Sequence, residues 1–306
     1  MGLKISVIIP TYYRNDLVCE AIESVLQQDY DPIELIVVDD SGTGHAKTVL
    51  DKYDQVKAII GKENRGWGGA YTTGIKASTG EYIQLLDDDD YLLEGKLSKT
   101  AELLDNDPEI GVAYCGLDMD VREPRFPDPE VSGDVLERAL RFKMFPCCTI
   151  TMLIEREVLL DTLPLATYGD DLDLMIELAQ RTKFDYVDEC LAFYRRETSS
   201  KWVSLKKFEE TKRIIRHQSD IYDQYPGIRR AVLAELYEKE GQARIRKYRW
   251  SLNAFLCFLK ATYYSDDNKL RCGGQAVASL FGRFGWDTAR RLRNHISLNT
   301  RTDNRS

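Results

Sequence analysis

The feature of this sequence best suited to chemistry is a run of four aspartates, Asp87 to Asp90. It directly follows the apolar segment 82–86, whose pattern predicts a buried strand. Like charges held so close together repel each other, so the cluster is unfavourable unless a cation neutralises it. Carboxylate oxygens are the ligands that Mg²⁺ and Mn²⁺ prefer. A solvated acidic turn is the alternative interpretation, and the buried strand before the run favours a metal site.

Two further pairs of acidic residues adjoin predicted elements, one after a strand and one at the start of a helix. Asp39 and Asp40 follow a second apolar segment, 33–38, where a carboxylate can accept a hydrogen bond from a ribose hydroxyl or a uracil imide. Asp-Ser-Gly is also ordinary turn chemistry, and the two interpretations are about equal. Asp170 and Asp171 open a predicted helix, where acidic residues commonly interact with the helix dipole. The functional alternative is a general base that takes the proton from an acceptor hydroxyl.

The elements that must position these residues alternate between strand and helix over the first 90 residues. Strands are expected at 5–9, 33–38, 57–60 and 81–86, with Pro10 ending the first, and helices at 16–28, 48–53 and 68–78. This alternation predicts a parallel sheet with helices on both faces. Ligands of such sheets gather beyond the carboxyl ends of the strands. The loops at 10–12, 39–41, 63–66 and 87–90 are therefore expected to converge.

The rest of the chain divides into a less regular middle and a helical end. The segment 118–133 is rich in proline and charge, which predicts an irregular loop. A strand is expected at 150–154, a helical turn at 156–161 and a helix from 170 to 182. Long helices are expected at 206–222 and 228–248.

Charge is divided unevenly along the chain. From Gly241 to the end there are 13 Lys/Arg and 4 Asp/Glu, although the whole chain carries −8. A basic end suits contact with anionic lipid headgroups, and a chance distribution of helical surface charge is the alternative. Aromatic residues lie beside these cations in 250–264 and 276–286. They suit a helix in the membrane interface or, equally, a helical hairpin that packs on the preceding domain or on a second subunit.

Several classes of protein are excluded by composition. No apolar run approaches the roughly 20 residues of a membrane-spanning helix, and no signal peptide is expected. The seven scattered cysteines form neither a disulfide framework nor a C-x-x-C metal site, and they suit a reducing cytosol. Three distant histidines do not predict a zinc site, and no nucleic-acid partner is expected.

Five segments in a fixed order resemble glycosyltransferase family 2, the inverting group with the GT-A fold. They are VIIPTYYRND, IELIVVDDSG, ENRGWGGAYTTGI, GEYIQLLDDDDYL and YGDDLDL, and the resemblance covers residues 3–200. Each motif alone is weak, but five in the right order and spacing are specific. The resemblance implies an α/β, Rossmann-like GT-A domain with a mainly parallel sheet over 1–203. Its nucleotide-binding half would end near residue 90 and its acceptor half would span 91–203, with a helical, basic extension over 204–306.

The resemblance also implies a role for each matched residue. Asp89 and Asp87 would bind a divalent metal, Mg²⁺ or Mn²⁺, with the register inside the run open by one residue, and Asp171 would be the catalytic base. In donor binding, Tyr12 would stack on the base and Asp40 would bond to uracil. The donor-binding set is Pro10, Thr11, Tyr12, Asp40, Arg65 and Asp88.

The expected function is an inverting glycosyltransferase that moves a sugar from a nucleotide-sugar donor, a UDP-sugar, to an acceptor. Family members with this layout often build surface polysaccharide or lipid-linked oligosaccharide. The resemblance therefore implies a lipid-linked glycan acceptor in cell-surface polysaccharide or glycoprotein glycan assembly, and a membrane-bound basic, aromatic end would agree with it. The enzyme would then be cytoplasmic and peripheral at the cytosolic face of an anionic membrane. The alternatives are a polyprenyl- or dolichyl-phosphate monosaccharide synthase and a non-catalytic nucleotide-sugar binding module. A sugar-1-phosphate nucleotidylyltransferase would carry a Gly-rich basic loop after the first strand, and residues 10–13 (PTYY) are not such a loop.

Overall fold

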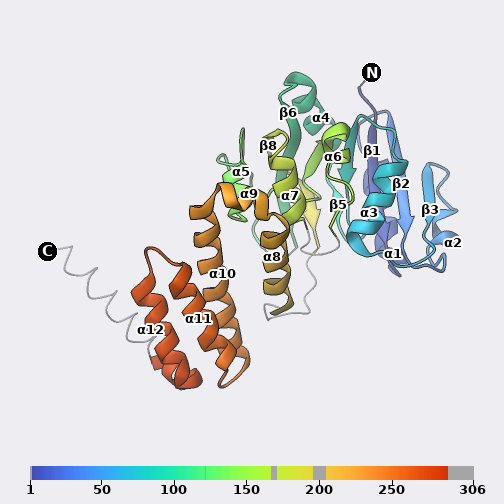
Figure 1. Cartoon of the computed structure of the whole chain (residues 1–306). Helices are drawn as coiled ribbons and strands as arrows, with labels where there is room; N and C mark the ends of the chain where they lie inside the picture. Colours follow the sequence, from blue (N-terminus) through green and yellow to red (C-terminus); the bar gives the residue numbers. More distant parts are fainter. Residues whose placement is uncertain (1, 121, 167–170, 196–204, 289–306) are drawn as a thin grey trace. The chain divides into compact units, whose positions relative to one another are not determined.

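A computed structural model describes residues 2–120, 122–166, 171–195 and 205–288. By internal contacts the chain divides into two units, residues 1–199 and 200–306, which are described separately (Figure 1). The domain boundary expected at 203 falls among residues 196–204, outside the described residues, and it stays a prediction.

The first half of the first unit is a β/α alternation, as the sequence predicts. It consists of strands β1 (Ile5–Thr11), β2 (Ile33–Asp39), β3 (Val56–Ile60) and β4 (Tyr82–Leu85), with helices α1 (Asn15–Leu26), α2 (Lys47–Leu50) and α3 (Gly66–Ala77). β1 is central and parallel to both neighbours, with Ile5 beside Ile33 of β2 and Tyr82 of β4. The carboxyl ends of these strands therefore meet at one edge of the sheet.

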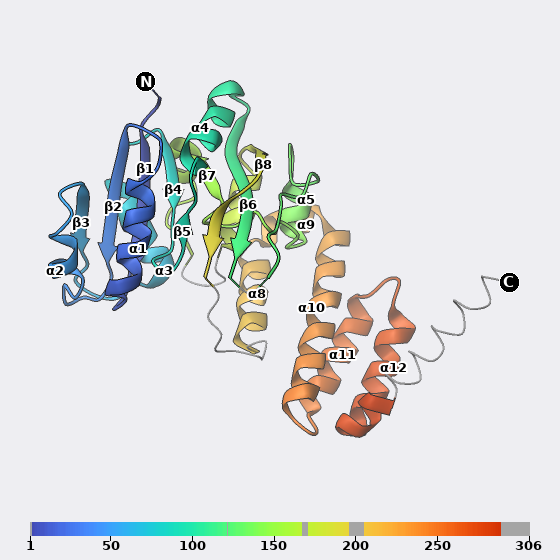
Figure 2. The same cartoon turned by 180° about the vertical axis from the view of Figure 1, so that it is seen from behind.

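The second half of this unit completes a mixed sheet. It consists of strands β5 (Tyr91–Leu92), β6 (Ile110–Met119), β7 (Met152–Glu155) and β8 (Lys183–Tyr194), with helices α4 (Lys96–Asn106), α5 (Leu136–Leu140), α6 (Arg156–Leu160) and α7 (Leu172–Ala179). The strand order of the described chain is β3-β2-β1-β4-β7-β6-β8-β5 (Figure 2). β7 runs antiparallel to β4 and β6, whereas β6 and β8 are parallel. The GT-A α/β architecture that the sequence predicts is confirmed. In the described sheet β7 and β5 run antiparallel to the other strands, a direction that the sequence did not predict.

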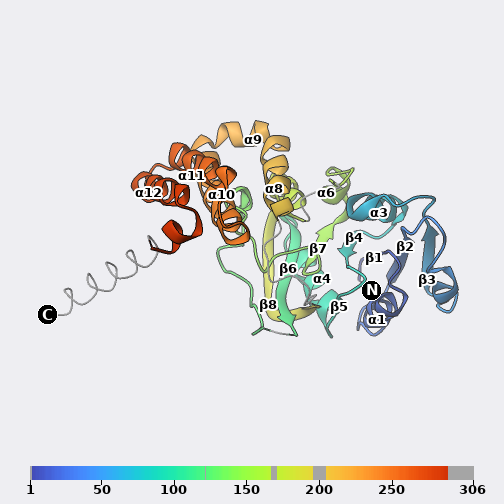
Figure 3. The ribbon, with the colours of Figure 1, turned by 90° about the horizontal axis from the view of Figure 1, so that it is seen from below.

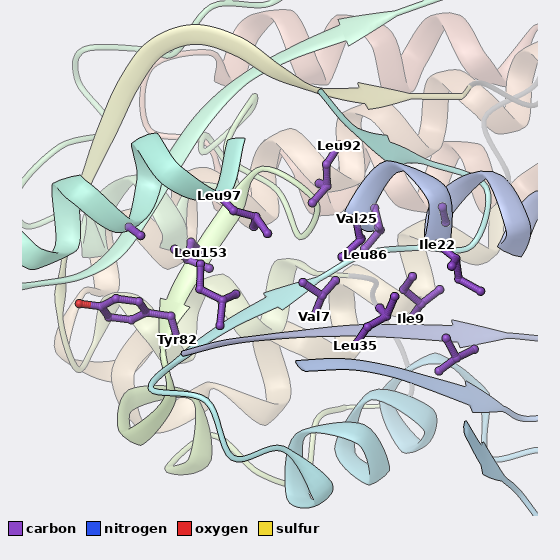
Figure 4. Packing of buried hydrophobic residues seen from close by; sticks show 14 of the residues in the cluster. Val7, Ile9, Ile22, Val25, Leu35, Tyr82, Leu86, Leu92, Leu97 and Leu153 are labelled. Atoms are coloured by element: carbon purple, nitrogen blue, oxygen red, sulfur yellow. The ribbon is translucent and has the colours of Figure 1, made fainter. Parts of the chain in front are cut away.

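Alternate residues of β1 face opposite layers of the unit. On one face Val7, Ile9 and Leu35 of β2 pack against Ile22 and Val25 of α1, and all five side chains are buried (Figure 4). Burial of each such aliphatic side chain contributes about 1.5–3 kcal/mol. This contact fixes α1, and with it the loop that leads from β1 into the helix.

On the other face α3 lies close against the sheet, so that α1 and α3 cover opposite sides of β1 (Figure 3). A Cβ on Gly74 would lie 2.3 Å from Cγ2 of Ile8, which leaves room only for glycine. Because α3 sits this close to the sheet, its first turn lies beside the strand ends.

The first strand runs two residues further than its sequence indicates. The expectation that Pro10 ends it is wrong, because β1 continues through Pro10 to Thr11 while still paired with β2. The carbonyl of Ile8 accepts from Leu86, so this side of β1 faces β4, and pairing with β4 ends at Ile8. The missing N–H of Pro10 therefore falls where no ladder bond is needed.

The irregular loop expected over 118–133 is confirmed for its described residues, except that it begins after Met119. β6 extends to Met119, and isolated bridges at Arg125 and Gly133 attach the following residues to the sheet. Gly116 weakens the strand pattern of β6, yet a Cβ there would meet the carbonyl oxygen of Arg125 at 2.7 Å. Close packing, which a local pattern does not reveal, requires this glycine.

The second unit is helical, as the sequence predicts. Its helices are α8 (Leu205–His217), α9 (Ser219–Gln224), α10 (Pro226–Lys247), α11 (Leu252–Tyr264) and α12 (Lys269–Leu280). The helix expected over 206–222 is interrupted at Gln218, and the one expected over 228–248 is α10. α11 packs between α10 and α12 around a core of Ile245, Ala254, Phe258, Ala276 and Trp286. No helix in the described ranges is long and apolar enough to cross a membrane.

Candidate active site

A cavity of about 450 Å³ lies where the carboxyl ends of β1, β2 and β4 meet the first turn of α3. Small-molecule sites typically enclose about 300–1,000 Å³. Of the residues that the sequence singled out, it is lined by Pro10, Thr11, Tyr12, Asp40, Asp87, Asp88 and Asp89. It is also lined by Arg14, Asn64, Gly66, Trp67, Ala70 and Tyr194. The expected convergence of all four loops is therefore observed, since Asn64 and Gly66 belong to the loop after the third strand.

Asp87 is hydrogen-bonded to a side chain of α3. The hydroxyl of Tyr71 donates a hydrogen bond to its Oδ1 at 2.9 Å. Desolvation raises the pKa of Asp87 to about 7 against the lowering effect of this bond, and the charges of Asp89 and Asp88 raise it further. A cation beside the carboxylate would favour its ionised form. The negative charges of the aspartate run are therefore not fully neutralised by their neighbours, and a divalent metal ion would neutralise them.

Arg14, in the loop before α1, bridges two members of the run. Its Nη1 lies 3.1 Å from Oδ1 of Asp88 and 2.8 Å from Oδ2 of Asp89. The hydroxyl of Thr11 donates to the other oxygen of Asp88 at 2.8 Å, and desolvation raises the pKa of Asp88. The Asp89 side chain is 22% exposed, against 8% for Asp88. Asp89 is therefore the better placed of the two to accept a further ligand.

Asp90 turns away from the cavity. It is buried, and its Oδ1 accepts the backbone N–H of Arg195 at 2.8 Å, which connects the aspartate run to the end of β8. Desolvation raises the pKa of Asp90 to about 8, so this group is mostly a neutral acid at pH 7. The first three members of the run line the cavity and the fourth does not.

The two aspartates after β2 have different surroundings. Asp39 is fully buried and accepts two backbone N–H groups of the following loop, at 2.9 and 2.8 Å. Asp40 accepts the N–H of Arg65 at 3.0 Å on both oxygens and that of Gly66 at 2.9 Å. Its negative charge therefore complements the positive end of α3. A carboxylate offers about four acceptor positions, so Asp40 retains one for a ligand in the cavity.

Two predicted donor-binding side chains lie at the edge of this arrangement. Tyr12 lines the cavity as a half-exposed ring, edge-on to Tyr13 at a centroid distance of 4.8 Å. Arg65 gives its backbone N–H to Asp40, but its side chain does not line the cavity, and its Nε lies 3.9 Å from Glu63. An exposed pair of this kind contributes at most about 1 kcal/mol, so little opposes a turn of Arg65 toward a ligand.

Asp171 comes from the acceptor half of the unit. It stands immediately before α7, and its Oδ2 accepts the N–H of Thr149 at 3.2 Å. It is not among the residues that line the cavity, yet its charge raises the pKa of Asp87. The two carboxylates are thus within electrostatic reach of each other. The neighbouring Asp170 lies outside the described residues.

The donor set of the cavity fits a magnesium-type ion. In the described ranges no three His, Cys, Asp or Glu side chains form a metal-binding group. Such ions nevertheless bind through one or two protein carboxylates and complete their shell with water and substrate phosphate. Asp89, partly exposed in the cavity, and Asp87, with its raised pKa, are carboxylates of this kind. The set fits an ion that shares its coordination with the phosphates of a ligand.

Sequence reasoning assigned no role to Arg14 and Tyr194 of the cavity lining, nor to Tyr71, which contacts Asp87 from α3. Arg14 lies in the loop after the first strand, at the same sheet edge as the aspartates, and this placement could have indicated a counter-ion. The partner of Tyr71 depends on the rotation of α3 over the sheet. Tyr194 reaches the cavity from the end of β8, and burial and the charge of Asp90 raise its pKa.

The fold and the acidic cavity at its strand ends define an α/β domain of the GT-A type. The sequence over residues 6–163 matches the model of glycosyl transferase family 2. This match covers more than half of the chain and includes every cavity residue except Tyr194. The chain therefore belongs to glycosyltransferase family 2, as its motifs predict.

Three relatives illustrate the similarity. The chain is 31% identical over 175 residues to an uncharacterized glycosyltransferase of Nostoc sp., across 53% of this chain and 54% of the relative. It is 37% identical over 100 residues to a GalNAc(5)-diNAcBac-PP-undecaprenol beta-1,3-glucosyltransferase of Campylobacter jejuni, across 31% of this chain and 32% of the relative. It is 27% identical over 216 residues to the putative teichuronic acid biosynthesis glycosyltransferase TuaG of Bacillus subtilis, across 66% of this chain and 84% of the relative. The alignments thus span about half of the first relative and a third of the second.

Solved structures extend the similarity of fold over nearly the whole chain. Residues 1–349 of S. aureus TarS, in complex with UDP-GlcNAc, match with a TM-score of 0.66 and 18% identity, across 94% of this chain and 92% of that one. The mannosyltransferase PcManGT of Pyrobaculum calidifontis, in complex with GDP-Man and Mn²⁺, matches with a TM-score of 0.57 and 19% identity. This match covers 91% of this chain and 81% of that one. Identities this low show the fold alone.

Proposed function

We propose that this protein transfers a sugar from a UDP-sugar to an acceptor, with inversion at the anomeric carbon. The observation that carries the proposal is the arrangement of carboxylates. Asp40, Asp88 and Asp89 line one cavity, and Asp171 stands within electrostatic reach of it. Membership of family 2 and the fold shared with a UDP-GlcNAc complex support the same reaction.

The donor nucleotide binds between the loops after β1 and β2. Tyr12 stacks on the uracil, and Asp40 accepts the imide N–H at the acceptor position that α3 leaves open. Asp88 is aimed at the ribose because Thr11 and Arg14 hold its two oxygens. Arg65 turns from Glu63 to the diphosphate when the donor arrives.

Asp89 and Asp87 would hold the Mg²⁺ or Mn²⁺ ion, which would offset the negative charge that develops on the departing diphosphate. The Mn²⁺ complex of a mannosyltransferase with this fold supports the use of a divalent ion. Arg14 positions Asp89 through its bond to Oδ2. Tyr71 holds Asp87 through its hydroxyl, which favours the ionised carboxylate.

Asp171 acts as the general base. It accepts the proton of the acceptor hydroxyl while that oxygen forms a bond to the anomeric carbon. The bond from this carbon to the diphosphate oxygen breaks, and UDP leaves with the electron pair. One base is sufficient because no covalent sugar–enzyme intermediate forms. Towards a lipid phosphate, which is already anionic, Asp171 contributes less.

The proposed acceptor is a lipid-linked glycan in cell-surface polysaccharide or glycoprotein glycan assembly, reached at the cytosolic face of an anionic membrane. Relatives named for an undecaprenol-linked sugar and for teichuronic acid support this class. The basic composition of residues 241–306 supports an anionic surface. A polyprenyl- or dolichyl-phosphate monosaccharide synthase is the alternative, and it differs in taking a lipid phosphate as acceptor.

UDP release from a panel of UDP-sugars with Mn²⁺ tests the proposal. Asp89→Ala is expected to abolish transfer, and Asp171→Asn to retain UDP binding while transfer falls about 100-fold or more. Asp54→Ala, at an exposed position of the same unit, is the matched control. Full activity of either site variant would remove its assigned role. UDP binding by the wild-type protein without turnover of any donor would instead identify a binding module.

A further inference from the structure

One end of the second unit gathers two segments that are distant in sequence. The loop between α10 and α11 lies against the end of α12, where Arg283 donates its N–H to the carbonyl of Arg249 at 2.8 Å. The indole N–H of Trp250 donates to the carbonyl of Leu280 at 3.0 Å. Six side chains at this end form what we call the aromatic tip: Tyr248, Trp250, Leu252, Leu280, Phe281 and Phe284.

The aromatic tip is exposed although the unit has a core of its own. Phe281 and Phe284 are 72% and 82% exposed, and Trp250 is 57% exposed. In contrast, Phe258 and Trp286 stack on each other at 5.1 Å inside the bundle. The tip residues are therefore not needed to fill the interior, and clustered apolar exposure of this kind marks an interaction surface.

The two segments that form the aromatic tip are also basic. Among residues 246–252 and 280–288 there is one carboxylate, Asp287, whose Oδ2 lies 3.8 Å from Nε of Arg283. Four exposed cations belong to the same segments: Arg246, Lys247, Arg249 and Arg283. This end of the unit therefore carries a local charge of +3, and the ammonium of Lys247 lies 5.4 Å from the ring centre of Tyr248.

The positive charge of the aromatic tip distinguishes between two surfaces that could cover it, a second copy of this chain and a lipid bilayer. In a two-fold symmetric dimer the same patch meets itself, so +3 would face +3 across a desolvated contact. An anionic bilayer instead offers phosphates to the cations and an interface in which tryptophan and tyrosine are favoured.

We propose that the aromatic tip docks on an anionic lipid bilayer, with Trp250, Phe281 and Phe284 in the interface and the four cations at the headgroup phosphates. This inference deepens the proposed function, on whose membrane-bound acceptor it rests, by naming the surface that brings the enzyme to that acceptor. It requires no change in the fold of the bundle.

Sedimentation of the full chain with vesicles tests the docking. The vesicles are phosphatidylcholine with or without about 30% phosphatidylglycerol. Binding is expected to be about tenfold or more stronger with the anionic lipid and to weaken in about 0.5 M salt. The double variant Phe281→Ser/Phe284→Ser is expected to lose about tenfold or more in affinity. Leu270→Ser, which changes an exposed leucine at the other end of α12, is the matched control.

The results separate the alternatives. Unchanged binding of the double variant, or equal binding to neutral vesicles, would overturn the proposal. So would a wild-type dimer that the same double substitution dissociates in analytical ultracentrifugation, since it would assign the tip to a second copy. UDP release measured without vesicles reports on the donor reaction independently, so docking without turnover would refute the proposed function and leave the tip assignment standing. Equal thermal unfolding temperatures of the three proteins would show that the bundle is intact.

Discussion

Replacement of Lys96 by methionine is expected to remove a large pH dependence from the stability of the first unit. Lys96 is fully buried at the start of α4, and its ammonium donates a hydrogen bond to Oε1 of Gln84 on β4. Desolvation lowers the pKa of Lys96 from 10.5 to about 8, with a weaker opposing effect of Cys115. The residue therefore costs stability wherever it is protonated inside the fold.

The sign and size of the effect follow from proton binding. Between pH 8 and 10.5 the unfolded chain keeps the Lys96 proton that the folded chain has lost, so stability rises with pH in this window. At 1.36 kcal/mol per pH unit, the full change in the free energy of unfolding is about 3 kcal/mol. About 2.5 kcal/mol of this change falls between pH 7 and 10. Lys96→Met removes this cost but leaves the Gln84 carbonyl without its donor, at about 1–2 kcal/mol. A net gain of about 1–2 kcal/mol is expected at pH 7.

Urea unfolding of the full chain at several pH values from 7 to 10 measures this effect. The free-energy difference between Lys96→Met and wild type should fall by about 2.5 kcal/mol across that range, since other titrating groups are common to both proteins. Lys52→Met, at an exposed position, should show a constant difference. A constant difference for Lys96→Met as well would refute the assignment of a charged lysine buried at neutral pH.

Three further substitutions test the site and the second unit. Tyr71→Phe removes the hydrogen bond that favours ionised Asp87, so the acid limb of the transfer activity should move to higher pH by about half a unit or more. Asp40→Asn should weaken UDP binding about tenfold by calorimetry and destabilise the first unit by about 1 kcal/mol, because the α3 N-terminus loses a charge-assisted acceptor. Glu240→Gln should destabilise the second unit by about 2 kcal/mol or more at pH 7. Glu240 is buried, with its oxygens 2.6 Å from Nζ of Lys212 and 2.7 Å from Nη2 of Arg244.

Each of these expectations has a contrary outcome. An unmoved pH profile in Tyr71→Phe would show that Asp87 does not limit transfer. Lower stability of Asp40→Asn with unchanged UDP affinity would make Asp40 a purely structural residue. Burial opposes ionisation of Glu240, but Lys212 and Arg244 outweigh it and lower its pKa below 4.5. Its stabilisation is therefore complete above pH 4.5 and lost at lower pH, so the Glu240→Gln difference should shrink towards pH 3.

The sequence by itself determined the first half of the first unit, from β1 to β4, and the convergence of its acidic loops. Buried β-branched runs that alternate with amphipathic helices leave few arrangements other than a sheet with parallel strands, and strands of that kind end at one edge. For this reason Thr11, Asp40 and Asp88 could be placed near one another from their positions after the strands. Five ordered motifs gave the family, because their spacing reflects the same set of strand ends.

Only the tertiary structure decided which atoms meet at that edge. Consecutive aspartates have similar local patterns, yet Asp89 reaches Arg14 while Asp90 turns to the backbone of Arg195. Such directions depend on how α1, α3 and β8 pack against the sheet, which involves residues up to 105 positions apart in the chain. The aromatic tip has the same origin, since Trp250 and Leu280 meet only when α10, α11 and α12 are packed. Periodicity records which face of an element is buried, whereas the partners of a polar side chain are set by the long-range packing that no local pattern contains.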